Sequence, residues 1–155
     1  MTALVIGLGS ADRGDDAAGL EAARILARVA PPGTAVRALP GRETTLLDVW
    51  KEAPLVIVID AVISGAAPGT VHVVDASKDR LRLGTPPGSS HAFGLAEVIE
   101  LGRALGQLPE RLVIVGIEAA DCGAGAPVSA PVRAGVHTAV RCVLEEIEAT
   151  SLHQP

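Results

Sequence analysis

Buried apolar runs alternate with helical patterns along this chain, and that alternation restricts the possible folds more than any other feature. Three runs are apolar almost throughout, "ALVIGLG" (3–9), "LVIVIDAV" (55–62) and "RLVIVGIEA" (111–119), and each predicts a strand that is covered on both faces. Apolar residues at helical spacing predict helices over 16–29, 43–52, 93–105 and along the C-terminal stretch that follows residue 130. Strands that alternate with helices indicate a three-layer α/β domain built on a mostly parallel sheet.

Two further runs complete the predicted sheet. The stretch "TAVRALP" (34–40) is a strand candidate, and in "TVHVVDA" (70–76) Val71 and Val73 alternate with polar neighbours, as in an edge strand with one wet face. The short turn before residue 70 cannot hold a crossover helix, so we expect this strand to run antiparallel to the others. We therefore predict a mixed five-stranded sheet with the run at 55–62 in its centre.

The size and composition suit one globular domain. The chain has 155 residues, of which 48% are hydrophobic and 20% are charged, enough for a full core. We expect a single domain over residues 1–155, with a frayed tail at 150–155. No apolar run approaches the roughly 20 residues that span a bilayer, and the start "MTALVIGLGS" looks like a first strand rather than a signal peptide. A cytoplasmic protein without a membrane partner is the expectation.

Charge and aromatic content argue against nucleic-acid binding. The formal net charge is −5, and the 13 lysines and arginines are scattered along the chain. Nucleic-acid binding needs a basic face, and single strands also need aromatic side chains on which bases stack. The only aromatic residues of the Phe, Tyr and Trp type are Trp50 and Phe93, so we expect no nucleic-acid partner.

Three ionisable side chains are expected at one edge of the predicted sheet. In open α/β sheets, ligands bind at the carboxyl ends of the parallel strands. Asp16 follows the first strand, Asp60 lies near the end of the central run, and His91 lies in the loop before the helix at 93–105. Two carboxylates and an imidazole from three separate loops can bind a divalent metal ion or form an acid–base pair.

Each of these residues also has a simpler explanation. An aspartate at the start of a helix is most often a cap or a partner of the helix dipole, contributing about 0.5–2 kcal/mol, and we assign that role to Asp15. His91 can be an ordinary loop histidine, whereas Asp60 places a charge at the rim of the core and is harder to explain in this way. Singly, each simple explanation is preferred; three such residues at one edge favour a site.

Other familiar active-site motifs are absent. Asp12 stands where the third glycine of a dinucleotide-binding fingerprint belongs, and the chain has neither a phosphate-binding G-x-x-x-x-G-K-[ST] loop nor a G-x-S-x-G elbow. Cys122 lies in the loop after the last strand and can be a nucleophile, although an ordinary thiol is the preferred explanation. Cys142 is expected to pack in the last helix. His72 is expected to point outward from its strand, and neither it nor His137 has a partner that the sequence identifies.

Four separated blocks of the sequence resemble one family. The blocks are "VIGLGSADRGDDAAG", "VIDAVISGAAPGTV", "SSHAFGLAEVIELGRALGQLP" and "VIVGIEAADCGAGAPVSAPV". Their order and spacing are similar to those of the hydrogenase maturation proteases, the peptidases that trim the C-terminus of [NiFe]-hydrogenase large subunits. The resemblance extends from about residue 3 to about residue 148.

This resemblance implies a fold, an activity and a set of site residues. The family fold is a twisted five-stranded sheet with helices on both faces, a phosphorylase/hydrolase-like αβα arrangement. The implied activity is that of an aspartic-type, nickel-dependent endopeptidase, which removes the C-terminal extension of a large-subunit precursor after nickel insertion. The family's nickel contacts fall on Asp16, Asp60 and His91, which would also be the catalytic residues. The precursor would carry the Ni²⁺, and the free protein would hold it weakly or not at all.

Several positions depart from the family pattern. Ser10 stands where many members have asparagine, "LPGRETT" (39–45) lacks the common Gly-Gly-Thr run, and "GIEAAD" (116–121) lacks a proline. These differences leave the three predicted contacts in place but leave the cognate substrate open. Two alternatives therefore remain, a related metal-dependent peptidase or amidase that acts on another precursor, and a non-catalytic chaperone or binding module that senses a metallated partner.

Overall fold

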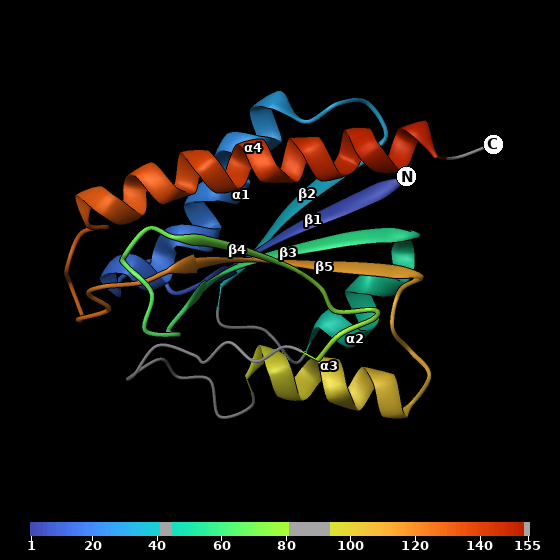
Figure 1. The fold of residues 1–155 in the computed structure, drawn as a ribbon, viewed down its shortest axis with the longest axis horizontal. Coiled ribbons are helices and arrows are strands. Elements are labelled where there is room, and N and C mark those ends of the chain that lie inside the picture. The colour runs from blue at the N-terminus through green and yellow to red at the C-terminus, as the bar shows by residue number, and fades with distance from the viewer. Residues whose placement is uncertain (41–44, 81–93, 154–155) are drawn as a thin grey trace.

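Five strands form one mixed sheet in the computed structural model, which describes residues 1–40, 45–80 and 94–153 (Figure 1). The strands are β1 (Ala3–Gly9), β2 (Thr34–Pro40), β3 (Leu55–Val62), β4 (Val71–Asp75) and β5 (Arg111–Glu118). Their order across the sheet is β2-β1-β3-β5-β4, and β4 is antiparallel to β5 while the other neighbours are parallel. The structure thus confirms the mixed sheet, its central strand and its antiparallel edge strand.

Helices cover both faces of this sheet. They are the 3-10 helix η1 (Gly14–Ala17), α1 (Ala18–Val29), α2 (Leu46–Val49), the 3-10 helix η3 (Trp50–Glu52), α3 (Leu95–Ala104) and α4 (Ala130–Leu152). Figure 1 shows α1 and α4 on one face and α2 and α3 on the other, which gives the three layers. Among the described residues, none of these helices is both long and apolar enough to cross a bilayer.

The core lies on both sides of the central strands. Every residue of β1 and β3 is buried, and alternate side chains enter two separate apolar clusters. Odd-numbered residues of β3 such as Ile57 pack with α1 and α4, whereas even-numbered ones such as Val58 pack with α2 and α3. This two-sided burial is the reason that the strands appear in the sequence as continuous apolar runs rather than as alternating ones.

The edge strand and the C-terminal end of the chain show how far the fold covers its margins. In β4, Val71 packs against the cluster of α1 and α4, but Val73 on the same face is 46% exposed, and Val74 on the other face packs against the cluster beneath α2 and α3. This edge strand is therefore covered along only part of its length. Helix α4 extends to Leu152, into the stretch expected to fray, and the Arg111 guanidinium donates a hydrogen bond to the Thr150 hydroxyl.

The start of α1 lies extremely close to the sheet. A Cβ atom added to Gly19 would lie 2.3 Å from the Leu8 carbonyl oxygen and 2.4 Å from the Ile59 carbonyl oxygen. These two carbonyls belong to the neighbouring parallel strands β1 and β3 near their carboxyl ends. Only glycine permits this approach, and it brings the first turn of α1 onto the edge where the candidate site residues lie.

Replacing Gly19 by alanine is expected to destabilise the protein by about 3 kcal/mol. Alanine favours helix formation over glycine by about 1 kcal/mol, but here its methyl group would collide with two backbone oxygens that belong to the sheet. Gly102→Ala in α3 is the matched control, because its added Cβ would meet only the ends of the Leu108, Leu47 and Trp50 side chains at 3.0–3.1 Å. Urea denaturation of both variants measures the difference, and equal stability losses would contradict the explanation.

Candidate active site

Four buried carboxylates lie at the carboxyl ends of the parallel strands, on several different elements. Among the described residues, the buried acidic side chains are Asp15, Asp16, Asp60 and Glu118, each at most 3% exposed. In the sheet, β2 is the neighbour of β1 on one edge of that strand and β3 is its neighbour on the other edge. The direction in which successive strands are added therefore reverses at β1. Such reversal points are where open α/β sheets bind ligands. The structure therefore places its buried acidic side chains where the fold class expects a site.

Asp16 lies in the tight turn that leads from β1 into the first helix. Its carbonyl oxygen accepts a hydrogen bond from the Ser10 N–H at 3.3 Å, and its own N–H donates to the Arg13 carbonyl oxygen at 3.1 Å. The 3-10 helix η1 that contains it contacts both β1 and β3. These contacts hold Asp16 against the carboxyl ends of both strands, with its side chain fully buried.

Asp60 is part of the central strand itself. It is paired in register with Gly116 of β5, and its Oδ1 accepts a hydrogen bond from the Ala61 N–H at 2.9 Å. Its neighbour Ile59 provides one of the carbonyls on which the start of α1 rests. Asp16 and Asp60 therefore come from two elements that touch each other at one edge of the sheet.

His91, the third predicted contact, lies outside the described residues. The described chain resumes at Gly94, and α3 begins with Leu95. Figure 1 shows α3 running back toward the amino ends of the parallel strands, where it leads into β5. The role of His91 therefore stays a prediction.

Asp15 does not cap its own helix, which corrects the expectation from the sequence. No side chain caps η1 or α1. Instead the Asp15 carboxylate accepts hydrogen bonds from the loop that follows β5, with the N–H groups of Ala120, Asp121 and Ser129 at 2.7–2.8 Å and the Ser129 hydroxyl at 3.0 Å. These partners are more than a hundred residues away along the chain, so no local pattern could reveal them.

The hydrogen bonds of Asp15 also decide its charge. Burial would raise the pKa of its carboxyl, but the donors from Ser129, Asp121 and Ala120 together outweigh burial and hold the pKa below the ordinary value of 3.8. Asp15 is therefore an anion at neutral pH. With its own N–H donating to the Asp121 carbonyl oxygen at 2.7 Å, it ties the turn after β1 to the loop before α4 and so fixes the backbone on which Asp16 is carried.

Glu118 is a buried acid that the sequence analysis did not single out. It ends β5, and its carboxylate accepts hydrogen bonds from the Ser64 N–H at 2.8 Å, from the Ser64 hydroxyl and from the His72 ring at 3.0 Å. Burial would raise its pKa, but Ser64 and His72 lower it below the ordinary value of 4.5. The missed signal was an acid at the end of a buried apolar run, the same pattern that identified Asp60. His72, for which the sequence identified no partner, thus has one in Glu118.

Cys122 lies beside the aspartates and is poorly suited to nucleophilic attack. Burial, together with the negative charges of Asp16 and Asp15, raises the pKa of its thiol to about 11. Because the thiolate is the nucleophilic form, a thiol that stays protonated at neutral pH agrees with the preferred explanation of an ordinary loop cysteine. The pKa of Cys142 in α4 is also raised, first by burial.

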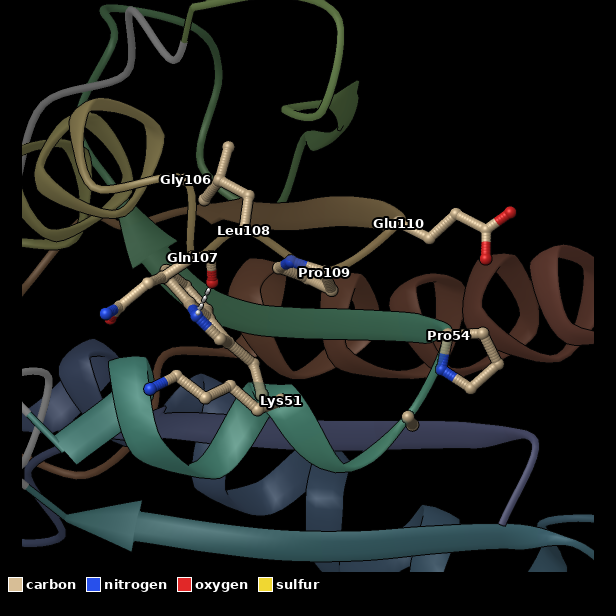
Figure 2. A pocket seen from close by; sticks show the side chains of 9 residues that line it. Lys51, Pro54, Gly106, Gln107, Leu108, Pro109 and Glu110 are labelled. Carbon is tan, nitrogen blue, oxygen red and sulfur yellow. Dashed lines mark hydrogen bonds between the residues drawn. The ribbon is translucent and has the colours of Figure 1, made fainter.

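A pocket of about 450 Å³ lies at the opposite end of the strands (Figure 2). Pro54, just before β3, and Pro109 and Glu110, just before β5, are among its lining residues. Trp50 donates a hydrogen bond from its ring nitrogen to the Gln107 carbonyl oxygen at 3.0 Å across it. Neither Asp16 nor Asp60 lines this pocket, so we take the buried acids and not the pocket to mark the candidate active site.

Comparisons with known proteins agree with this geometry. The sequence profile of the HycI hydrogenase maturation proteases matches residues 42–146. The hydrogenase expression/formation protein HupD of Rhizobium leguminosarum bv. viciae is 32% identical over 145 residues, which are 89% of this chain and 72% of that protein. The chain belongs to the hydrogenase maturation protease family.

Solved structures of hydrogenase maturation proteases share the fold. The hydrogenase maturating endopeptidase HybD from E. coli is 25% identical and superposes with a TM-score of 0.80, covering 97% of this chain and 94% of that one. The [NiFe] hydrogenase maturation protease HybD from Thermococcus kodakarensis is 26% identical with a TM-score of 0.69, covering 94% and 98% of the two chains. The family resemblance seen in the four sequence blocks is thereby confirmed, and so is the αβα fold class.

The donors that this hydrogenase maturation protease presents are carboxylate oxygens. Oxygen and imidazole ligands suit Ni²⁺, so Asp16 and Asp60 fit the type of contact that the resemblance implies. Within residues 1–40, 45–80 and 94–153, no three or more His, Cys, Asp or Glu side chains are grouped so that they could hold a metal ion.

Proposed function

We propose that this protein is the endopeptidase that removes the C-terminal extension of a [NiFe]-hydrogenase large-subunit precursor after nickel insertion. Asp16, Asp60 and His91 would contact the nickel that the precursor carries, so that only metallated precursor is cut. The observation that carries the proposal is the burial of Asp16 and Asp60 on touching elements at the carboxyl ends of β1 and β3, in a chain of this family.

Hydrolysis of a peptide bond needs an activated water and a proton donor for the departing amine. A carboxylate at the rim can accept the proton of the attacking water and then deliver it to the amine. In this proposal one of Asp16 and Asp60 acts as that base, which makes the enzyme aspartic in type. Precursor-borne nickel would supply Lewis-acid polarisation of the scissile carbonyl.

The proposed ligand set also suggests why the enzyme would contact nickel bound to the precursor and would not hold a nickel ion of its own. The proposed contacts, two carboxylates and one imidazole, form an open three-ligand set without the cysteine ligands of a closed structural metal site. An ion that arrives with its own ligands from the precursor needs few further donors. We therefore treat the nickel as part of the substrate and propose no tightly bound metal for the free enzyme.

The test is the intact mass of a nickel-loaded large-subunit precursor after incubation with this protein, beside a nickel-free precursor. We expect a C-terminal peptide to be lost only from the loaded sample. Cleavage of both samples would remove nickel from the proposal. Binding without any mass change would favour a non-catalytic sensor of the metallated partner, and neither binding nor cleavage would point to another precursor.

A further inference from the structure

We infer that Glu118, His72 and Ser64 form a positioning network that fixes Asp60 for the nickel-bearing substrate. The inference rests on the proposed function and adds to it three residues outside the three predicted contacts. Its basis is the register of three neighbouring strands, the hydrogen bonds of one buried carboxylate and the chain segment that this carboxylate holds.

The register places the network beside Asp60. Asp60 is paired with Gly116, and Gly116 is paired with His72 on the other side of β5. Residues in one row across a sheet point to the same face, and with strands about 4.8 Å apart the two outer Cα atoms are roughly 10 Å apart. Gly116 has no side chain, so β5 itself puts nothing between the carboxylate of Asp60 and the imidazole of His72.

Glu118 lies next to this row, and its side chain is on the same face of the sheet. It lies two residues after Gly116 on β5, and side chains two apart on a strand share a face. Its Oε1 is 3.0 Å from the His72 Nε2. Because an ionised carboxylate can only accept hydrogen bonds, Nε2 must carry the proton, which fixes the ring. The imidazole is 24% exposed and Glu118 only 2%, so the network runs from the rim into the interior.

The same carboxylate holds the chain that leaves β3 just after Asp60. The backbone N–H and the hydroxyl of Ser64 both donate to Glu118, the N–H at 2.8 Å. The backbone of Glu118 adds two bonds to the end of the same connector, donating to the Thr70 carbonyl oxygen and accepting from the Gly69 N–H, each at 2.8 Å. One residue thus clamps both ends of the β3–β4 connector.

An ionised side chain is needed for this arrangement, and not merely a polar one. The Glu118 carboxylate accepts from two Ser64 donors and one His72 donor at the same time. A glutamine has only one acceptor oxygen. Its NH₂ group would take the place of the second carboxylate oxygen and would face a Ser64 or His72 donor there. Since a displacement of about 1 Å in a catalytic constellation can lower the rate by about a hundredfold, loosening the segment after Asp60 should be visible in function.

The chain contains a matched control at the other end of β4. The Asp75 carboxylate also accepts hydrogen bonds from both the N–H and the hydroxyl of a serine, Ser77, and it also has a nitrogen-bearing side chain nearby, Arg111, at 3.8 Å. Asp75 lies at the amino ends of the parallel strands, away from Asp60. Asp75→Asn therefore repeats the chemical change of Glu118→Gln without touching the candidate site.

The experiment compares Glu118→Gln, Ser64→Ala and Asp75→Asn with the wild type. Two quantities are measured: kcat on nickel-loaded precursor, and the ratio of the Kd values for nickel-free and nickel-loaded precursor. We expect Glu118→Gln to lower kcat at least about tenfold and to lower the Kd ratio about tenfold. Ser64→Ala should give a smaller loss in both, and Asp75→Asn should leave both within about twofold of the wild type.

The Kd ratio separates positioning from stability. A partly unfolded variant loses binding to both forms of the precursor in proportion, so its ratio stays unchanged. The inference is overturned if Glu118→Gln and Ser64→Ala keep the wild-type ratio and kcat, or if Asp75→Asn loses as much as Glu118→Gln. If Glu118→Gln fails to fold, kcat and the Kd ratio of Ser64→Ala decide whether the inference holds. A wild type that neither cleaves nor prefers loaded precursor refutes the proposed function instead.

Discussion

Replacing Asp16 by asparagine is expected to lower cleavage of the nickel-loaded precursor by about 10²–10⁴-fold, the range that loss of a general base produces. The amide keeps the size and shape of the carboxylate but can neither accept the proton of the attacking water nor offer a charged ligand to nickel. Asp16 is fully buried in η1, which contacts both β1 and β3, so an isosteric change replaces the carboxylate with little change in packing. Intact mass measured over time gives the rate.

The turn that carries Asp16 also provides the control. Asp12 is an exposed acid in the same turn, and Asp12→Asn removes one negative charge without touching the candidate site. We expect this variant to cleave at the wild-type rate. His91→Ala is expected to behave like Asp16→Asn. An Asp16→Asn enzyme that still processes precursor normally would take Asp16 out of the mechanism and leave Asp60 as the base to test next.

Replacing Asp15 by asparagine is expected to lower the free energy of unfolding by about 3 kcal/mol. The buried carboxylate accepts four hydrogen bonds from Ala120, Asp121 and Ser129, whereas an amide has one acceptor oxygen and would turn its own N–H₂ toward at least one of these donors. Asp121→Asn is the control, because Asp121 is exposed and its Oδ1 accepts a hydrogen bond only from the Gly123 N–H among the described residues. Urea denaturation at pH 7 measures both, and a loss below 1 kcal/mol for Asp15→Asn would contradict the expectation.

The pH dependence of stability gives an independent check on Asp15. Its pKa in the folded protein is lower than its ordinary value of 3.8, so its contribution is fully present above that value and is lost as the pH falls through the lower folded pKa. Glu118, whose ordinary value is 4.5, contributes with the same sign. The wild type should therefore lose stability below about pH 4, and the difference between it and Asp15→Asn should shrink as the solution becomes more acidic.

The sequence by itself determined the strands of the sheet, its central and antiparallel members, and two candidate site residues. The bounds of β1, β2 and β3 agree with the expected ranges 3–9, 34–40 and 55–62, because strands buried on both faces need continuous apolar residues and this requirement is local. The antiparallel edge strand followed from the length of one turn. Asp16 and Asp60 were identifiable because the ends of parallel strands meet at one edge wherever the chain alternates strands with helices.

Only the tertiary structure decided what the remaining polar residues do. Asp15 and Asp16 are adjacent and chemically identical in the sequence, yet Asp15 binds donors that lie between Ala120 and Ser129 while Asp16 lies against β1 and β3. Glu118 likewise accepts hydrogen bonds from Ser64 and His72, which are distant from it in the chain. A buried carboxylate must obtain hydrogen bonds from whatever the fold brings near it, and no local pattern records which donors those are.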